Sequence, residues 1–392
     1  MDQRDDTILI VGGGPVGLTL AWRLTLAGLP VRLFEADDHI VDQLRASTFH
    51  PPTLDLFEDA GITDELIENG RITPTWQVRM HATGERAEFD LAVLAGETNH
   101  PYRLQCRQAI LSRAIAARLP DGVIRFGATV DAVSQDETGV SLTIGDETVH
   151  GAYLVGCEGA RSLVREAIGA EFIGGTYPEE TVLVTTHFPF EDHLDGLSGV
   201  NYIWKPDGTY SLLRLPDLWR ISLHPRAGQS VEGIMNDDVI RAHMAEVIPA
   251  AGRMDIIEKR IYRVHHRVAT QYRKGRMFIA GDAAHLNSPK GGMGLNGGVH
   301  DAWVLADKLA AVANGGDESV LDEYERQRLP IARDDIVSQA DANRARMNTR
   351  DETKRRDHLA ELQAIAADPD KARAFLLRSS MILGLRRSEA LL

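Results

Sequence analysis

Cysteine is nearly absent from this chain of 392 residues, which contains only Cys106 and Cys157. A framework of disulfides is therefore not expected, and the cytoplasm, where thiols stay reduced, is the simplest location. The first six residues are acidic where a secretory signal would be basic. No apolar run approaches the roughly 18 residues of a membrane span. These absences predict a soluble globular protein that does not bind a membrane.

Positive charge is also scarce, because 43 Lys and Arg residues face 57 Asp and Glu residues and the formal net charge is -14. Nucleic acids and anionic membrane surfaces bind basic patches, so neither is an expected partner. The sequence shows no cluster of metal ligands, internal repeat or low-complexity tract. Its hydrophobic content of 43% is enough for a large core, and we expect two interleaved domains.

The N-terminal stretch carries the pattern of a dinucleotide-binding unit. An apolar strand at 7–11 precedes Gly12, Gly14 and Gly17, and a helix and a second strand then lead to Glu35. In this fingerprint the first glycine makes the tight turn and the second lets a pyrophosphate approach. The third packs the helix on the strand, and the acid binds ribose hydroxyls. The pattern predicts a bound dinucleotide without separating NAD from FAD.

A second glycine-rich stretch runs from 277 to 302. The apolar run 277–280 predicts a buried strand, Gly281-Asp282 a turn, and 290–298 a loop with five glycines before a helix that begins near Val299. An acid at a strand end can accept a hydrogen bond from a ribitol or ribose hydroxyl, and glycines let a flat ligand rest against backbone amides. The plainer alternative is a connection whose glycines only make turns.

These motifs resemble those of the single-component FAD-dependent aromatic hydroxylases, the fold group of para-hydroxybenzoate hydroxylase. The matching residues are Gly-Asp-Ala-Ala-His at 281–285, Pro289, Gly-Gly-x-Gly-x-Asn at 291–296, and Asp301-Ala302. A third motif at 158–165 has Glu158 where the family has Asp. The resemblance covers residues 7 to about 330 and is strongest to short members of the para-nitrophenol 4-monooxygenase type.

The resemblance implies an α/β fold, with a Rossmann-like FAD-binding domain interleaved with a β-sheet substrate domain and followed by C-terminal helices. The expected division is 1–178 and 269–340 for the FAD-binding domain, 179–268 for the substrate sheet and 341–392 for the helical region. The expected FAD-binding residues are Gly12, Gly14, Pro15, Val16, Gly17, Glu35, Arg45, Gln108, Val130, Asp282, Gly294, Leu295 and Asn296. Arg107 is an alternative to Gln108, and Arg161 and Arg165 either meet a phosphate or make surface ion pairs.

By the same resemblance, NADPH or NADH reduces FAD, oxygen adds at the flavin C4a position, and the hydroperoxide hydroxylates a phenolic or hydroxylated heteroaromatic ring. The expected catalytic residues are Pro289 beside the flavin and His224 or His265 as general base, with His266 and Tyr262 as alternatives. The expected substrate contacts are Tyr202, Tyr210, Arg214 and Lys290. The partners are then a small aromatic substrate and oxygen, and the C-terminal helices are candidates for a homodimer contact.

Three rival functions remain open at this level. A flavin halogenase shares the fold but carries a Trp-x-Trp-x-Ile-Pro element, which the five tryptophans here do not form. An NAD-linked dehydrogenase would lack the second motif. A flavoprotein without catalytic activity would show no substrate-dependent oxidation of NAD(P)H.

Overall fold

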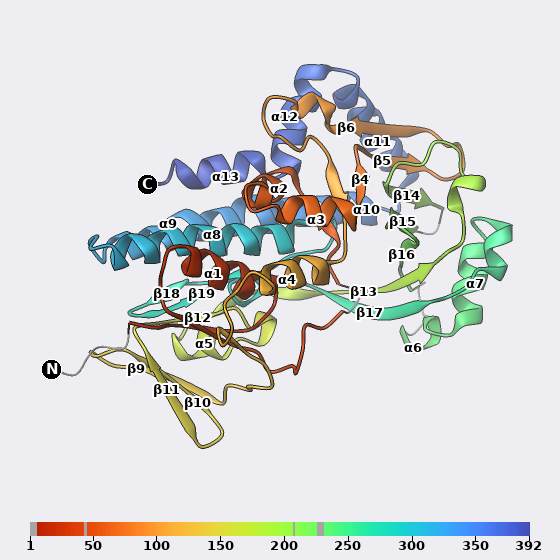
Figure 1. Ribbon diagram of the computed structural model, residues 1–392. Helices are drawn as coiled ribbons and strands as arrows, with labels where there is room; N and C mark the ends of the chain where they lie inside the picture. The colour runs from red at the N-terminus through yellow and green to blue at the C-terminus, as the bar shows by residue number, and fades with distance from the viewer. Residues whose placement is uncertain (1–5, 43–44, 207, 226–230) are drawn as a thin grey trace.

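The computed structural model describes residues 6–42, 45–206, 208–225 and 231–392, and the course of the chain can be followed in Figure 1. One half of the molecule is built on a six-stranded sheet in the order β18-β19-β12-β1-β2-β8. Its neighbours pair in parallel except for β18. The strands are β1 Ile8–Val11, β2 Val31–Phe34, β8 Ile124–Arg125, β12 Tyr153–Gly156, β18 Arg273–Lys274 and β19 Met277–Ile279.

The strands β1, β12 and β19 at the centre of this sheet are short apolar runs because helices cover them. All four residues of β1 are buried, as expected for a parallel strand with both faces covered. The helices of this half are α1 Pro15–Leu26, α2 Pro51–Glu58, α3 Ile62–Glu68, α4 Gln108–Ala116, α5 Leu163–Ala167, α8 Met293–Ala313 and α9 Val320–Pro330. Two small sheets complete it, β3-β7-β4 and β11-β10-β9, with β3 Thr48–Phe49, β4 Arg71–Thr73, β7 Arg103–Gln105, β9 Ala132–Gln135, β10 Val140–Ile144 and β11 Glu147–Gly151.

The other half is an eight-stranded sheet in the order β20-β17-β13-β16-β15-β14-β5-β6. Its strands are β5 Thr75–Met80, β6 Arg86–Asp90, β13 Phe172–Thr186, β14 Val200–Lys205, β15 Gly208–Arg214, β16 Trp219–Leu223, β17 Glu258–Ala269 and β20 His285–Leu286. The long strands β13 and β17 pair from Phe172↔Ala269 to Thr185↔Glu258 and pass between the two halves in Figure 1. They therefore tie the halves together.

The expected division, which assigns residues 1–178 to the FAD-binding domain, misplaces one segment. Strands β5 and β6 lie early in the chain, yet β5 pairs in parallel with β14, with Val200 opposite Trp76. Residues 75–90 thus belong to the eight-stranded sheet. The remaining boundaries of the expected division stay predictions.

The two faces of the eight-stranded sheet are covered by different elements. Leu212 and Ile221 pack in one cluster with the helix α7, Asp237–Ala245, which follows the short helix α6, Val231–Ile234. Val78 and Leu213 pack on the other face with the C-terminal helices α10 Ser338–Asn348, α11 Glu352–Ala366 and α12 Pro369–Ser379. Neighbouring positions alternate between the faces because side chains of a strand point alternately up and down. This alternation decides which residues face the 289–292 loop, on the side of the C-terminal helices.

The helix expected from Val299 begins earlier, at Met293, because Gly297 and Gly298 pack closely: a Cβ on either would lie 2.6 Å from Ile336 or Val16. Helix α9 is followed by a π-helical turn, Ile331–Val337, directly after Pro330, whose ring prevents the regular hydrogen bond. Helix α12 is separated from α13, Ile382–Glu389, by Met381, which is left-handed with φ 66°.

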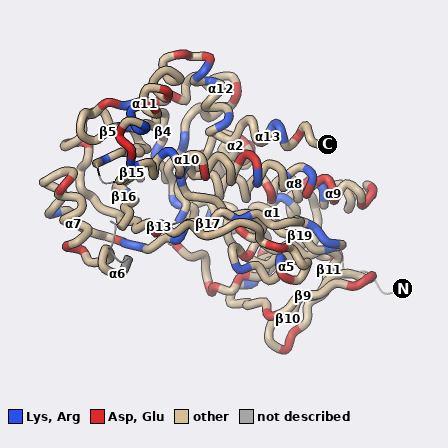
Figure 2. Tube along the Cα trace, turned by 180° about the vertical axis from the view of Figure 1, so that it is seen from behind, with Lys and Arg blue, Asp and Glu red and all other residues tan. Residues whose placement is uncertain are grey.

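Acidic and basic residues are interspersed over these elements in Figure 2. Within the described ranges, no helix combines the length and apolar character needed to cross a bilayer.

Candidate functional site

The three glycines of the first motif occupy three different environments. Gly12 has φ +103°, and a Cβ there would lie 2.5 Å from the carbonyl oxygen of Cys157. A Cβ on Gly17 would lie 2.0 Å from the carbonyl oxygen of Gly12, so the helix and the turn are in contact. A Cβ on Gly14 would meet nothing within 4 Å. The loop therefore leaves room for a ligand at the position where the fingerprint places a pyrophosphate.

Glu35 lies directly beside this loop. One carboxylate oxygen accepts a hydrogen bond from the Gly13 amide at 2.5 Å, and the other accepts one from the Asp37 amide at 2.9 Å. The carboxylate thus stands at the carboxyl end of β2, half-buried and next to the start of α1, where Pro15 and Val16 lie. This is the placement expected of an acid that binds ribose hydroxyls.

The two glycine motifs are in contact with each other. A Cβ on Gly281 would lie 2.9 Å from a methyl group of Val16. Segments about 265 residues apart in the sequence therefore form one surface.

Asp282 follows β19 at the carboxyl end of the six-stranded sheet, and its side chain is exposed. Burial nevertheless raises the pKa of its carboxyl, and the nearby charges of His285 and Arg45 lower it in part. Burial likewise raises the pKa of Tyr262 to about 12 and lowers the pKa of Arg220 to about 10, although solvent reaches both. Such groups lie in a recess, accessible but surrounded by protein on most sides.

The turn that carries Asp282 rests on a buried ionic network. Asp301 of α8 accepts hydrogen bonds from the Gly281 amide at 3.1 Å, from His285 Nε2 at 2.8 Å and from Arg328 Nε at 2.7 Å. The side chains of His285, Asp301 and Arg328 are fully buried. The charges of Arg328 and His285 outweigh burial and lower the pKa of Asp301 to about 2. Asp301 therefore stays ionised and holds the turn in place.

The N-terminus of α8 offers backbone donors to the same region. Gly292 is left-handed with φ 70° before the helix, and the amides of Met293, Gly294 and Leu295 have no carbonyl of the helix to bond. The side chain of Asn296 is fully buried and committed: it accepts from the His50 amide at 2.9 Å and donates to the Thr48 and Gly292 carbonyls. Asn296 thus fixes the shape of the helix start.

Tyr202 connects the eight-stranded sheet to the 289–292 loop. Its hydroxyl accepts a hydrogen bond from the Gly291 amide at 3.1 Å, and His50 Nε2 donates to the Gly291 carbonyl at 2.8 Å. Pro289 is exposed in this loop, and Lys290 Nζ donates to Asn348 at 3.1 Å. The expected residues Tyr202, Pro289 and Lys290 are therefore brought together.

Tyr210 and Arg214 are not brought to this surface. Tyr210 is 2% exposed in the cluster packed against α7, and its hydroxyl lies 3.2 Å from His81 Nδ1. Arg214 pairs with Glu191 at 3.5 Å and lies over the Trp219 ring. Both point to the opposite face of the sheet because they stand an even number of residues from Leu212. The faces could not be assigned from the sequence, because it does not show which strands pair.

Arg220 is the residue that sequence reasoning missed. It alternates with Trp219 and Ile221, which are core residues of the opposite face, so it points toward the recess. Its guanidinium donates to the Arg45 carbonyl at 3.0 Å, and its charge interacts with Tyr202 and Tyr262. The alternation within β16 was the signal that could have found it.

The two histidines expected as general bases have local partners. His224 Nδ1 lies 3.3 Å from the Thr181 hydroxyl. His265 Nδ1 lies 2.8 Å from the Thr176 hydroxyl, and burial together with Arg267 and Arg263 lowers its pKa. Neither contact shows a route to a substrate, so both roles remain predictions.

The other expected FAD contacts lie around the first domain. Arg45 is exposed, and Gln108 is the first residue of α4, with its amide donating to the Ala46 carbonyl at 3.3 Å. Val130 packs partly buried against the main core. The alternative residue Arg107 pairs with Asp42 at 3.5 Å.

The motif at 158–165 makes hydrogen bonds within itself and to the turn at Ala283. Glu158 accepts from the Val164 amide at 2.9 Å, while its second oxygen is buried without a partner and burial raises the pKa of the carboxyl. Arg165 is 6% exposed and donates to the carbonyls of Ala160 and Ala283. It makes no surface ion pair with a described residue, and its alternative role at a phosphate stays a prediction. Arg161 is exposed.

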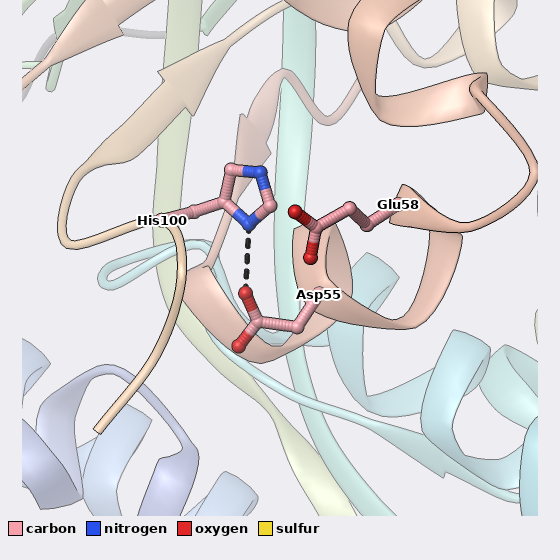
Figure 3. A group of neighbouring side chains, drawn as sticks. All are labelled: Asp55, Glu58 and His100. Carbon is pink, nitrogen blue, oxygen red and sulfur yellow. Dashed lines mark hydrogen bonds and ion pairs between the residues drawn. The ribbon is translucent and has the colours of Figure 1, made fainter. Parts of the chain in front are cut away.

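Among the residues that the structure describes, one group of three potential metal ligands occurs away from this site, formed by Asp55, Glu58 and His100 (Figure 3). His100 Nδ1 lies 2.7 Å from Asp55, which also accepts from the Thr98 hydroxyl, and Glu58 accepts from Asn99. These bonds fasten the 98–100 turn to α2, which accounts for the group without an ion.

The open loop at Gly14, the acid beside it and the free amides of α8 fit a bound flavin dinucleotide, so fold and site define an FAD-binding flavoprotein. Residues 5–339 match the family described as FAD binding domain. The chain belongs to this family, and its α/β fold with C-terminal helices is the one expected.

Three relatives make the class more specific. Para-nitrophenol 4-monooxygenase of Pseudomonas sp. (strain WBC-3) is 33% identical, with 97% of each chain covered. The 6-hydroxy-3-succinoylpyridine 3-monooxygenase of Pseudomonas putida (strain DSM 28022 / S16) is 33% identical over 84% of each. The crystal structure of p-nitrophenol 4-monooxygenase from Pseudomonas putida DLL-E4 superposes with a TM-score of 0.88 at 31% identity, covering 97% of this chain and 98% of that one. The protein is thus an FAD-dependent monooxygenase of the aromatic hydroxylase type, and the halogenase alternative is not favoured.

Proposed function

We propose that this monooxygenase uses NADH or NADPH and molecular oxygen to hydroxylate a phenol or a hydroxylated heteroaromatic ring. The observation that carries the proposal is the contact between Tyr202 and Gly291, which brings one face of the eight-stranded sheet against the loop of Pro289. A ring held at this junction would lie next to the recess of Asp282, Tyr262 and Arg220. The named relatives act on a phenol and a hydroxypyridine, which supports the same substrate class.

The residues would divide the work between cofactor and substrate. Gly14, Glu35, Asp282 and the first amides of α8 would hold FAD, which supplies hydride acceptance and oxygen activation when bound. Arg220 would stabilise the phenolate form of the substrate, since a buried guanidinium favours a nearby anion. Pro289 would keep water from the ring, and His224 is kept as a candidate base.

Two further parts of the proposal concern the setting of the protein. Both cysteines are free, and burial raises the pKa of the Cys106 thiol to about 12, which suits a reducing cytoplasm. The C-terminal helices remain the candidates for a homodimer contact, which sedimentation velocity would test.

Labelled oxygen gives the direct test. Purified FAD-loaded protein is incubated with NADH or NADPH, ¹⁸O₂ and a panel of phenols and hydroxypyridines. We expect substrate-dependent oxidation of the nicotinamide and a product heavier by one ¹⁸O atom. A product that carries only oxygen from water would refute the monooxygenase reaction for this chain, and no stimulated oxidation with any member would refute the substrate class.

Arg220 and Arg214 provide a matched pair of variants, because they come from neighbouring strands and face opposite sides of the sheet. Arg220→Met should raise the KM for a phenol about tenfold or more, because a charge-assisted hydrogen bond is worth about 1.5–3 kcal/mol. Arg214→Met should leave that KM within about twofold. Equal effects of the two substitutions would remove Arg220 from the proposed site.

A further inference from the structure

A hollow lies on the face of the eight-stranded sheet that is turned toward the 289–292 loop, between that sheet and the C-terminal helices. Strands β5, β14 and β7, helices α10 and α12 and the loop at Lys290-Gly291 contribute to its wall. It shares Tyr202 and Gly291 with the proposed substrate site, so the two regions are continuous at this hydrogen bond.

The charge in this hollow is of one sign. Arg103, Lys290 and Arg346 line it, and no Asp or Glu is among the described lining residues. Lys290 donates to the neutral side chain of Asn348. Burial lowers the pKa of Arg346, and the charge of Glu361 offsets this only in part. The chain as a whole carries a net charge of -14, so a hollow lined by three cations and no described acid has the opposite sign of charge to the rest of the protein.

Arg103 is the most informative of the three. It is 3% exposed, and its Nε is buried without a hydrogen-bond partner. Among the described residues its guanidinium has one hydrogen-bond acceptor, the Ser379 carbonyl at the long distance of 3.5 Å, and it lies 5.1 Å from the centre of the Trp76 ring. No ion pair joins it to a described carboxylate. Because an unpaired buried charge is costly, a built site for an anion explains this guanidinium better than packing does.

The remaining wall is aromatic. Trp76 stacks with Phe375 at a centroid distance of 6.1 Å, and Tyr202 meets Trp76 edge-on at 6.2 Å. Flat apolar surfaces beside guanidinium groups suit a ligand that is aromatic at one end and anionic at the other.

We propose that this hollow is the subsite for the carboxylate of an aromatic acid, which pairs with Arg103 and Arg346 while its apolar part contacts Trp76, Tyr202 and Phe375. That this acid is also the compound hydroxylated rests on the proposed function; its phenolic end would then point to the 289–291 loop. The hollow measures about 30 Å³, room for about two waters. Binding of a ring therefore requires the hollow to widen, and the proposal includes a change of rotamer by the long side chains of Lys290 and Arg346 that line it.

Calorimetry with the FAD-loaded protein tests the binding itself. The probes are 4-hydroxybenzoate, 4-hydroxyphenylacetate and 3-(4-hydroxyphenyl)propionate, each compared with its neutral carboxamide. At least one acid should bind tenfold to a hundredfold more tightly than its amide, the value of a charge-assisted pair. Arg103→Gln and Arg346→Gln should reduce this ratio toward one. Arg71→Gln, an exposed arginine on the adjacent strand β4, should leave it unchanged.

If Arg103→Gln fails to fold, the comparison is made with Arg346→Gln alone, because Arg346 is only half-buried. No preference for any acid, or a preference that both Arg103→Gln and Arg346→Gln retain, would overturn the subsite. Stimulated NAD(P)H oxidation by neutral phenols together with no acid preference would overturn the subsite alone. Tight binding of an acid that stimulates no oxidation would support the subsite and count against the proposed function.

Discussion

Removing the charge of the buried Asp301 carboxylate should lower the free energy of unfolding more than removing that of an exposed aspartate. In Asp301→Asn the guanidinium of Arg328, which is fully buried, loses its only ion pair among the described residues. Breaking a buried pair by removing one partner costs about 3–5 kcal/mol. Asp307 stands in the same helix and also pairs with an arginine, Arg23, but its side chain is 56% exposed. Asp307→Asn should therefore cost less than about 1 kcal/mol.

The pH dependence gives the same carboxylate a second signature. Its folded pKa of about 2 lies below the ordinary value of 3.8, so the stabilisation is complete above about pH 4 and is lost as the pH falls toward 2. The difference corresponds to about 2 kcal/mol. Asp301→Asn should lack this contribution to acid unfolding, whereas Asp307→Asn should retain it.

Urea unfolding followed by circular dichroism from about pH 2 to about pH 7 measures both effects, with FAD retention recorded beside it. Because Asp301 also accepts from the Gly281 amide, Asp301→Asn should release flavin more readily than Asp307→Asn. A loss of stability equal to that of Asp307→Asn would show that Arg328 finds another partner and would refute the reasoning.

Three shorter predictions concern the cofactor and the loop. Gly14→Val should fold but largely abolish the visible absorbance of bound flavin, because the space open at Gly14 is filled. Gly17→Ala should instead reduce soluble yield, because its Cβ would collide with the Gly12 carbonyl; equal behaviour of the two variants would indicate that Gly14 does not contact the cofactor. Glu35→Ala should weaken FAD binding by about 1–3 kcal/mol, measured by fluorescence titration, and an unchanged Kd would assign Glu35 to the loop alone. Tyr202→Phe removes the acceptor of the Gly291 amide and should raise substrate KM more than FAD Kd; the reverse order would place Tyr202 outside the substrate site.

The sequence was sufficient for the parts of the fold that depend on local pattern. The strand, glycine turn, helix and acid at 7–35 and the motif at 281–302 led to the FAD-binding domain, because each motif combines backbone requirements with one acid at a fixed spacing. The glycines at 297 and 298 were misread as loop residues. Glycine lowers helix propensity, but here the absence of a side chain permits the contacts with Ile336 and Val16.

What the sequence could not supply was the pairing of distant strands. Nothing in the local sequence of residues 75–90 shows that β5 joins β14 in parallel. The partner of Arg328 and the fold-back of Arg165 onto Ala283 depend on the same distant contacts. The long strands β13 and β17 create these contacts after the chain has left and re-entered the first domain.

One contact is enough to tell which face of the eight-stranded sheet is turned toward the proposed substrate site. Once Tyr202 is known to meet Gly291, strand alternation and the pairing of Leu213 with Arg220 place Arg220 on the same face and leave Arg214 on the other. Tyr202, Tyr210 and Arg214 were thus assigned to one pocket because they are near each other in sequence. Of these three, Tyr202 faces the loop, and the other two lie on the opposite face. A slip of one residue in β16 would exchange Arg220 for Trp219 on this face. If Arg220 binds the substrate as proposed, the register of this strand would matter for substrate choice as much as the flavin motifs matter for the cofactor.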